Sequence, residues 1–207
     1  MFTGIVQGCY PVTAVDKQQG LIQFSVELPE SIIAGLTVGA NVAVDGVGLA
    51  TVAIDGCRVS FQDAEEIQRS TLSTVVPGRC VNIERSATFG SEISGHIVSG
   101  HIMGTARIVK AEFTENYQVL TLECPSCWMK YILTQGFIAL DGVSLTVVDA
   151  HRGGRFTVPL APEILQATTF GYKGQGDDVN LEVDPHTQII VETVERLVAD
   201  NPSCQHQ

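Results

Sequence analysis

The sequence is poor in basic residues, with 12 lysines and arginines against 23 acidic residues and a formal net charge of −11. The basic residues are scattered along the chain instead of being clustered. Nucleic-acid binding needs clustered lysine and arginine side chains that contact phosphates. We therefore expect no nucleic-acid partner, and we interpret the acidity as a solvated surface.

Long apolar runs are also missing, and no stretch reaches the roughly 18 residues that span a membrane. The apolar segment at 136–140 is followed at once by Asp141, and residues 1–6 carry no cationic stretch of the kind found in signal peptides. We expect no membrane association, and the predicted location is the cytoplasm.

Several site signatures are absent as well. The sequence has no phosphate loop, no HExxH helix, no GxSxG elbow and no GxGxxG fingerprint. Cys124 and Cys127 form a CxxC pair without the second pair or nearby histidines that a structural zinc site uses. We expect this pair to be inert, with a redox role or metal binding as alternatives, and we predict no metal site.

What the chain does contain is an internal duplication. Residues 41–50 (NVAVDGVGLA) reappear as residues 137–146 (FIALDGVSLT), and residues 81–84 (VNIE) reappear as residues 179–182 (VNLE). This spacing is too long for a solenoid repeat and fits a whole small domain. We predict two similar domains at 1–90 and 91–186 and a C-terminal segment at 187–207, with two similar pockets for a ligand that is needed twice.

Short β-rich runs between glycine and aspartate residues predict a mainly β fold, as a barrel or sandwich. The expected strands lie at 22–28, 40–44, 50–54, 59–61, 80–85, 118–123, 155–158 and 178–183, with two more between 136 and 148. Short helices are expected at 29–36, 64–72, 125–133 and 162–169. A longer amphipathic helix is expected at 187–199, where it packs on its own domains or forms a subunit interface.

Two histidines stand out in the segment GHIVSGHIMG at 95–104. His96 and His101 are five positions apart, which suits neither one helix face nor one strand face, so a shared metal is not expected. A lone histidine is usually structural, but a neutral imidazole at His101 is the best candidate general acid or base. Asp45 and Asp141, each followed by glycine, are interpreted as turn residues and not as a catalytic carboxylate pair.

Four segments make the chain similar to the riboflavin synthases of the alpha-chain type. They are MFTGIV at 1–6, GHIVSGHIM at 95–103, DGVSLTV at 141–147 and VNLEVDP at 179–185. The resemblance covers essentially the whole chain and extends to the non-catalytic lumazine proteins of luminous bacteria. It implies a mainly β fold of two tandem six-stranded Greek-key closed barrels, related by internal duplication, plus a C-terminal α-helix that assembles a homotrimer.

The resemblance implies the last step of riboflavin biosynthesis. Two molecules of 6,7-dimethyl-8-ribityllumazine are dismutated to riboflavin and 5-amino-6-ribitylamino-pyrimidinedione, with no metal or organic cofactor, and riboflavin or FMN binds as product or ligand. The active site is expected between the N-terminal barrel of one subunit and the C-terminal barrel of a neighbour, where two substrates are held in register. Lumazine synthase is a further expected partner, and luciferase a partner only if the protein is an antenna.

Position by position, the resemblance implies catalytic roles for Phe2, His101, Ser144 and Thr146. Residues 2–6 match the N-terminal pocket edge, residues 100–102 the equivalent edge of the second barrel, and Ser144 and Thr146 its hydroxyl pair. Glu66 is expected to hold ribityl hydroxyls. The implied ligand-binding residues are Thr3, Gly4, Ile5, Val6, Gly48, Leu49, Ala50, Gln62, Asp63, Ala64, Glu65, Glu66, Ile67, Gly100, Ile102, Gln135, Leu145, Pro159, Leu160, Ala161, Pro162, Glu163 and Ile164.

The chain also departs from the family pattern. Gly48 replaces the cysteine usually proposed as nucleophile, Ala50 replaces a threonine, Asn41 a serine and Gln135 a lysine. Losing a nucleophile and a hydroxyl together removes transition-state stabilisation. Two functions therefore stay open. One is a synthase in which water or a ribityl hydroxyl supplies the nucleophile, and the other is a non-catalytic lumazine- or flavin-binding carrier, sensor or antenna.

Overall fold

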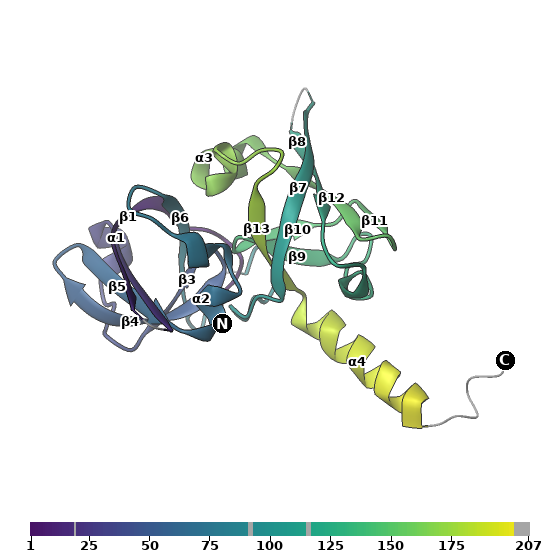
Figure 1. The fold of residues 1–207 in the computed structure, drawn as a ribbon, viewed down its shortest axis with the longest axis horizontal. Coiled ribbons are helices and arrows are strands. Elements are labelled where there is room, and N and C mark those ends of the chain that lie inside the picture. The colour runs from purple at the N-terminus through teal and green to yellow at the C-terminus, as the bar shows by residue number, and fades with distance from the viewer. Residues whose placement is uncertain (19, 91–92, 115–116, 201–207) are drawn as a thin grey trace.

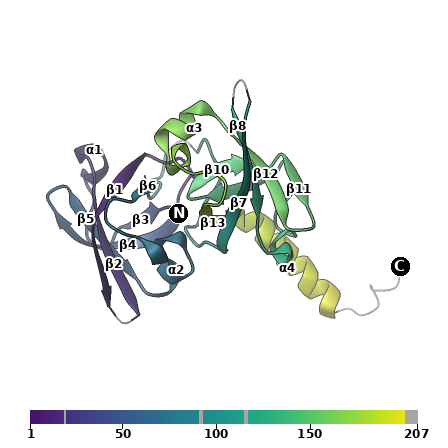
Figure 2. The same ribbon diagram turned by 45° about the horizontal axis from the view of Figure 1, so that its top comes forward.

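The computed structural model describes residues 1–18, 20–90, 93–114 and 117–200. Cys204 and the loose tail that the sequence predicts after Pro202 lie outside these residues. Two β domains lie side by side, and the helix α4 (Pro185–Asp200) projects away from the second domain (Figure 1). The N-terminus lies where the two domains meet, as a second view also shows (Figure 2). The predicted domain limits at 90 and 186 stay a prediction.

The first domain is a closed six-stranded antiparallel barrel with the strand order β1-β2-β5-β4-β3-β6. Its strands are β1 (Gly8–Gln18), β2 (Leu21–Glu27), β3 (Asn41–Val44), β4 (Val47–Asp55), β5 (Arg58–Asp63) and β6 (Cys80–Arg85). Short helical segments connect them: α1 (Glu30–Ile33), α2 (Glu65–Gln68) and the 3₁₀ turn η1 (Thr71–Thr74). The sequence did not predict β1, which contains Pro11 and an irregular register between Val12 and Ala14.

The second domain repeats this plan in a seven-stranded sheet of order β10-β9-β13-β7-β8-β12-β11. Its elements are β7 (Gly104–Phe113), β8 (Gln118–Glu123), η2 (Ser126–Trp128), β9 (Phe137–Leu140), β10 (Val143–Thr146), β11 (Asp149–His151), β12 (Arg155–Leu160), α3 (Pro162–Ala167), η3 (Thr169–Gly171) and β13 (Asp178–Val183). The edge strands β10 and β11 are consecutive in the chain and together take the place of β4. The sequence predicts a second closed six-stranded barrel, but this sheet has seven strands and stays open between its edge strands β10 and β11.

The physical reason is a change of partner at one corner. Val147 N donates to Gly136 O at 2.9 Å, and the next residue, Val148, donates to Thr157 O at 2.9 Å. Within one residue the chain thus stops pairing with the β9 end of the sheet and begins to pair with the β12 end. In the first domain Thr51 makes the equivalent bond to Ala40 O at 2.9 Å, and β4 absorbs the corner as an irregular register between Thr51 and Ala53.

The helix predicted at 125–133 is wrong. Residues there form successive 3₁₀ turns, in which Trp128 N donates to Pro125 O and Tyr131 N donates to Trp128 O, both at 2.9 Å. This path buries Met129, Tyr131 and Ile132 together in the core of the second domain, a spacing that one α-helical face does not offer. Packing has overridden the local helical preference. The strands predicted at 80–85, 118–123 and 178–183, by contrast, coincide with β6, β8 and β13.

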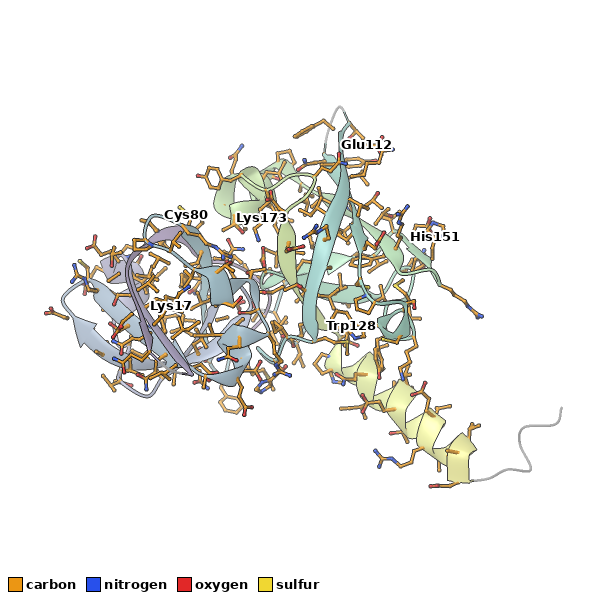
Figure 3. All side chains as sticks on the ribbon, in the orientation of Figure 1. Lys17, Cys80, Glu112, Trp128, His151 and Lys173 are labelled. Atoms are coloured by element: carbon orange, nitrogen blue, oxygen red, sulfur yellow. The ribbon has the colours of Figure 1, made fainter. Side chains whose placement is uncertain are left out.

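Each domain has its own hydrophobic core. The first contains Phe24 and Phe61, whose ring centroids are 5.7 Å apart, and the second is built around Phe156 and Leu122. A small third cluster joins the domains and consists of Phe2, Ala43, Val98 and Ala139. Side chains fill both domains, and Lys173 lies on the side of the second domain that faces the first (Figure 3).

Candidate functional site

The N-terminal segments of the two domains cross over each other. Phe2 N donates to Val98 O at 2.7 Å and Val98 N donates to Phe2 O at 3.0 Å, so the segments before β1 and β7 pair as an antiparallel bridge. Beyond this bridge each segment reaches the opposite domain. Ser144 N on β10 donates to Gly4 O, and Gly48 N on β4 donates to Gly100 O, both at 2.8 Å. Each pocket edge is thus completed by the other domain.

A buried glutamate holds each segment in place. Glu84 on β6 accepts hydrogen bonds from Thr3 N at 2.7 Å and Thr3 Oγ1 at 2.8 Å. Glu182 on β13 accepts the equivalent bonds from Ser99 N at 2.6 Å and Ser99 Oγ at 2.8 Å. Burial raises the pKa of both carboxyls, and these hydrogen bonds oppose the rise. Sequence reasoning missed both anchors, although the repeated VNIE and VNLE segments carry them.

A symmetric polar network forms the interface between the domains. Asp45 and Asp141 sit in turns with a φ of 45°, as the sequence predicts, but both are also fully buried. Asn82 Nδ2 donates to Asp141 O at 2.9 Å, and Asn180 Nδ2 donates to Asp45 O at 2.8 Å. The two turns therefore fix the relative orientation of the domains.

The second domain holds an apolar cavity of about 580 Å³. Residues that the sequence predicts at the site line it, namely Ser144, Leu145, Thr146, Pro159, Ala161 and Ile164. Tyr117, Val119 and Val148 also line it and were missed, because their apolar or aromatic side chains carry no chemical signature. An apolar cavity with a few polar groups at one edge is typical of sites for small heterocyclic ligands.

Other predicted residues of the second domain lie elsewhere. Leu160 is fully buried in the core, and Pro162 and Glu163 are exposed on α3. Gln135 is exposed in a turn with a φ of 65°, where its backbone N donates to Val147 O at 2.8 Å. These four residues do not line the cavity.

His101 belongs to the first domain's side of the site. Its Nδ1 lies 3.6 Å from Glu66 Oε1 of the first domain, and its side chain is exposed. The sequence grouped His101 with Ser144 and Thr146 at the second barrel, and this grouping is wrong. The reason is the crossover, because residues 100–102 continue from the segment that binds β4 of the first domain.

Glu66 carries a buried oxygen that faces no partner in the described part of the chain. Its Oε1 accepts a hydrogen bond from Arg69 Nη2 at 2.6 Å, while Oε2 is buried without a hydrogen bond there. Its backbone N donates to Asp63 Oδ1 at 2.8 Å, which fixes the start of α2. A buried carboxylate oxygen with no donor is a ready acceptor for a ligand hydroxyl.

The remaining predicted residues of the first domain separate into core and surface. Ile67, Leu49 and Ile102 are buried in the first-domain core. Gln62, Ala64, Glu65, Ala50 and Ile5 are exposed, and Gly48 and Val6 are half-buried. A Cβ built on Gly48 would lie 3.4 Å from both Gly100 Cα and Phe2 Cε2, which is ordinary contact. The position therefore accommodates a small side chain.

Among residues 1–18, 20–90, 93–114 and 117–200, no group of three or more His, Cys, Asp or Glu side chains could hold a metal ion. Burial raises the pKa of the Cys124 thiol to about 11, so it is no reactive thiolate at neutral pH. No helix of the described chain has the length and apolarity needed to cross a membrane.

Comparison with known proteins supports a single family. A model of the lumazine binding domain matches residues 3–86 and 99–184. Riboflavin synthase of Escherichia coli (strain K12) is 44% identical over 209 residues, covering 100% of this chain and 98% of that protein.

Solved structures of LumP show the same fold. LumP complexed with riboflavin superposes with a TM-score of 0.82 at 26% identity, covering 88% of this chain and 99% of that one. LumP complexed with 6,7-dimethyl-8-(1'-D-ribityl) lumazine gives a TM-score of 0.80 at 26% identity with the same coverage. With two lumazine binding domains and this identity along its whole length, the chain belongs to the riboflavin synthase family.

Proposed function

We propose that this protein is a riboflavin synthase, which converts two molecules of 6,7-dimethyl-8-ribityllumazine into riboflavin and 5-amino-6-ribitylamino-pyrimidinedione. The observation that carries the proposal is the 44% identity to a riboflavin synthase through both domains. The 580 Å³ cavity agrees with it, because its volume and apolar lining suit a bicyclic ring with polar edges.

In the second domain the substrate ring lies in the apolar cavity, and the hydroxyls of Ser144 and Thr146 bind its polar edge. In the first domain Glu66 Oε2 accepts a hydrogen bond from a ribityl hydroxyl, which satisfies a buried oxygen that has no hydrogen-bond donor among the described residues. His101, exposed and next to Glu66, serves as the general acid or base.

Catalysis requires two substrates in contact, and the two pocket edges of one chain belong to different domains. We propose a homotrimer in which the first domain of one subunit faces the second domain of a neighbour. The exposed apolar side chains of α4, including Ile190 and Val194, support an intersubunit contact, because such a stripe is unfavourable in water. Holding two reactants in register then supplies most of the rate acceleration.

The proposal requires no metal or organic cofactor, since the four-carbon unit moves between two identical substrates. Riboflavin and FMN are then product-like ligands of the same sites. We propose a cytoplasmic location and lumazine synthase as the partner that supplies substrate.

A non-catalytic lumazine- or flavin-binding protein is the alternative. Gly48 carries no nucleophile and Ala50 carries no hydroxyl at the first-domain pocket. The resemblance to LumP, whose structures are complexes with riboflavin or a lumazine, favours binding. Luciferase would be a partner only under this alternative.

The test is to incubate the purified protein with 6,7-dimethyl-8-ribityllumazine and to follow riboflavin by fluorescence, beside a Gly48→Cys variant. Turnover by the wild type supports the synthase. Tight binding without turnover supports the alternative, and activity restored by Gly48→Cys then locates the loss at that position. A Cβ at Gly48 would come no closer than 3.4 Å to its neighbours, so the backbone tolerates the Cβ of the cysteine and the variant is expected to fold.

A further inference from the structure

Ser144 is paired with a histidine at the edge of the second-domain cavity. His96 Nδ1 lies 2.7 Å from Ser144 Oγ, within hydrogen-bond distance. The two residues come from different elements, Ser144 from β10 and His96 from the segment before β7. The backbone of Ser144 is held independently by Gly4 O, so the contact joins three parts of the chain.

His96 is held in a defined orientation. It is only 7% exposed, and its ring stacks on Phe137 with centroids 5.2 Å apart and planes inclined by 10°. Burial lowers the pKa of His96, and the charge of Asp184 partly opposes this. At neutral pH the ring is therefore a neutral imidazole with one N–H and one lone pair.

The backbone beside His96 shows how close this approach is. A Cβ built on Gly95 would lie 2.2 Å from Thr3 O and 2.9 Å from Ser144 Cβ. Only glycine at this position lets the histidine segment come so near to β10 and to the crossed N-terminal segment.

A purely structural role does not account for His96. Buried imidazoles usually have both ring nitrogens hydrogen-bonded. In the part of the chain that is described, His96 Nε2 is buried with no hydrogen-bond partner, so Ser144 is the hydrogen-bond contact that the ring makes there. Replacing the ring by an apolar side chain of similar size would therefore break the hydrogen bond to Ser144 and no other hydrogen bond of the described chain.

A neutral imidazole next to a hydroxyl decides what the hydroxyl offers to a ligand. When Nδ1 accepts, the Ser144 hydrogen points at His96 and Oγ faces the cavity as an acceptor. When Nδ1 donates, the Ser144 hydrogen is free to be donated into the cavity. In both cases Ser144 presents one defined hydrogen-bonding function instead of a freely rotating hydroxyl.

We infer that His96 is a positioning residue, which fixes the Ser144 hydroxyl so that the second-domain cavity recognises one polar edge of the lumazine or flavin ring. The inference rests on the proposed function. It applies to the second domain alone, because the counterpart of Ser144 in the first domain is Gly48, which has no side chain. The two ligand sites of the proposed function are thereby made chemically different for two identical substrates.

The test is equilibrium binding of riboflavin and of 6,7-dimethyl-8-ribityllumazine, measured by fluorescence titration. The variants are His96→Leu, which removes the hydrogen bond, His96→Asn, whose amide can reproduce the contact of Nδ1, Ser144→Ala, and the double variant His96→Leu with Ser144→Ala. His151→Leu is the matched control, because His151 is an exposed histidine of β11 in the same domain.

We expect His96→Leu and Ser144→Ala each to weaken binding about tenfold, as for the loss of one oriented hydrogen bond. The double variant should be no weaker than either single one, His96→Asn should recover most of the affinity, and His151→Leu should bind like the wild type. ¹⁵N NMR of the ligand-free protein should show the His96 ring resonances move in Ser144→Ala, which tests the pairing without ligand.

Additive losses in the double variant, or a His96→Asn variant as weak as His96→Leu at unchanged melting temperature, would overturn the inference. A wild type that binds neither ligand would instead overturn the proposed function. The two failures are thus separate results.

Discussion

Arg79 donates a hydrogen bond from Nη2 to Asp45 Oδ2 at 3.0 Å, at a carboxylate that is fully buried between the two domains. Lys173 makes the equivalent contact to Asp141 in the second domain. Burial, and then the charge of Asp141, raise the pKa of Asp45 to about 6, while Lys173 and Arg79 oppose this rise. The interface therefore contains a carboxyl group whose pKa, at about 6, lies well above the ordinary value for an aspartate.

The stability of the protein should depend on this group. Because the pKa of Asp45 is higher in the folded chain than its ordinary value of 3.8, the folded state holds a proton that the unfolded chain has already released between about pH 4 and 6. The free energy of unfolding should therefore fall as the pH rises through this window and then level off. Urea unfolding at several pH values measures it.

Asp45→Asn should reduce this pH dependence, because it removes the titrating group. Glu84 and Glu182 have raised pKa values of the same sign, so part of the slope should remain. Asp16→Asn, at an exposed position on β1, is the control and should keep the wild-type slope. An Asp45→Asn variant with the full wild-type slope would contradict the assignment.

Asn82→Ala should destabilise the protein strongly. Asn82 Oδ1 accepts a hydrogen bond from Thr169 N at 2.8 Å, and its Nδ2 donates to Asp141 O at 2.9 Å, so the change leaves two buried groups of the other domain unpaired. We expect a loss of about 2–4 kcal/mol in the free energy of unfolding. Asn41→Ala, at an exposed side chain on β3, is the matched control. Similar losses in both variants would refute this role.

Gly100→Ala tests the crossed segments. Gly100 has a φ of 88°, and an added Cβ would lie 2.8 Å from Phe2 Cε2 and 3.0 Å from Gly48 Cα. Gly39→Ala is the control, because Gly39 has a φ of 90° and an added Cβ would have no atom of the described residues within 4 Å, so it reports backbone strain alone. We expect Gly100→Ala to cost at least about 1 kcal/mol more than Gly39→Ala and to weaken riboflavin binding as well. Equal losses of stability in the two variants would mean that the close approach of Gly100 to Phe2 and Gly48 is unimportant.

Much of this architecture can be predicted from the sequence, because the duplication and the alternation of buried residues mark the strands. The repeated VNIE and VNLE segments even carry the interdomain asparagines and the anchoring glutamates. What the repeat cannot predict is which domain a segment contacts. Gly4 and Gly100 occupy equivalent positions in the two repeats, but each of them hydrogen-bonds to a strand of the other domain. For this reason His101 lies beside Glu66 of the first domain and not beside Ser144 of the second.

His96 shows a second limit of sequence reasoning. Its spacing from His101 argues against a metal pair, and a single buried histidine has no further pattern to interpret. Its contact with Ser144 arises from packing between segments 48 residues apart, which only the fold reveals.

Charging the exposed face of α4 should dissociate the proposed trimer. Ile190 and Val194 lie on one side of the helix, and both are more than half exposed. The double change Ile190→Glu with Val194→Glu should give a monomer by sedimentation equilibrium and abolish turnover that depends on two subunits. Ala199→Glu, on the opposite side of the helix by its spacing, should leave the mass unchanged. A double variant with the wild-type mass would exclude α4 from the interface.

His101→Gln should lower turnover of 6,7-dimethyl-8-ribityllumazine by about 10²-fold, as for removal of a general acid or base. Its free energy of unfolding should stay unchanged, because the side chain is exposed and its contact with Glu66 is 3.6 Å long. His186→Gln is the matched control: the His186 side chain is also exposed and its Nδ1 lies 3.5 Å from Asp184 Oδ1, but at the start of α4. Loss of activity in His101→Gln alone, with riboflavin binding retained, would separate proton transfer from binding. Equal activity in both variants would leave His101 without a catalytic role, and the proton would then have to move through water or through the substrate's own ribityl hydroxyls.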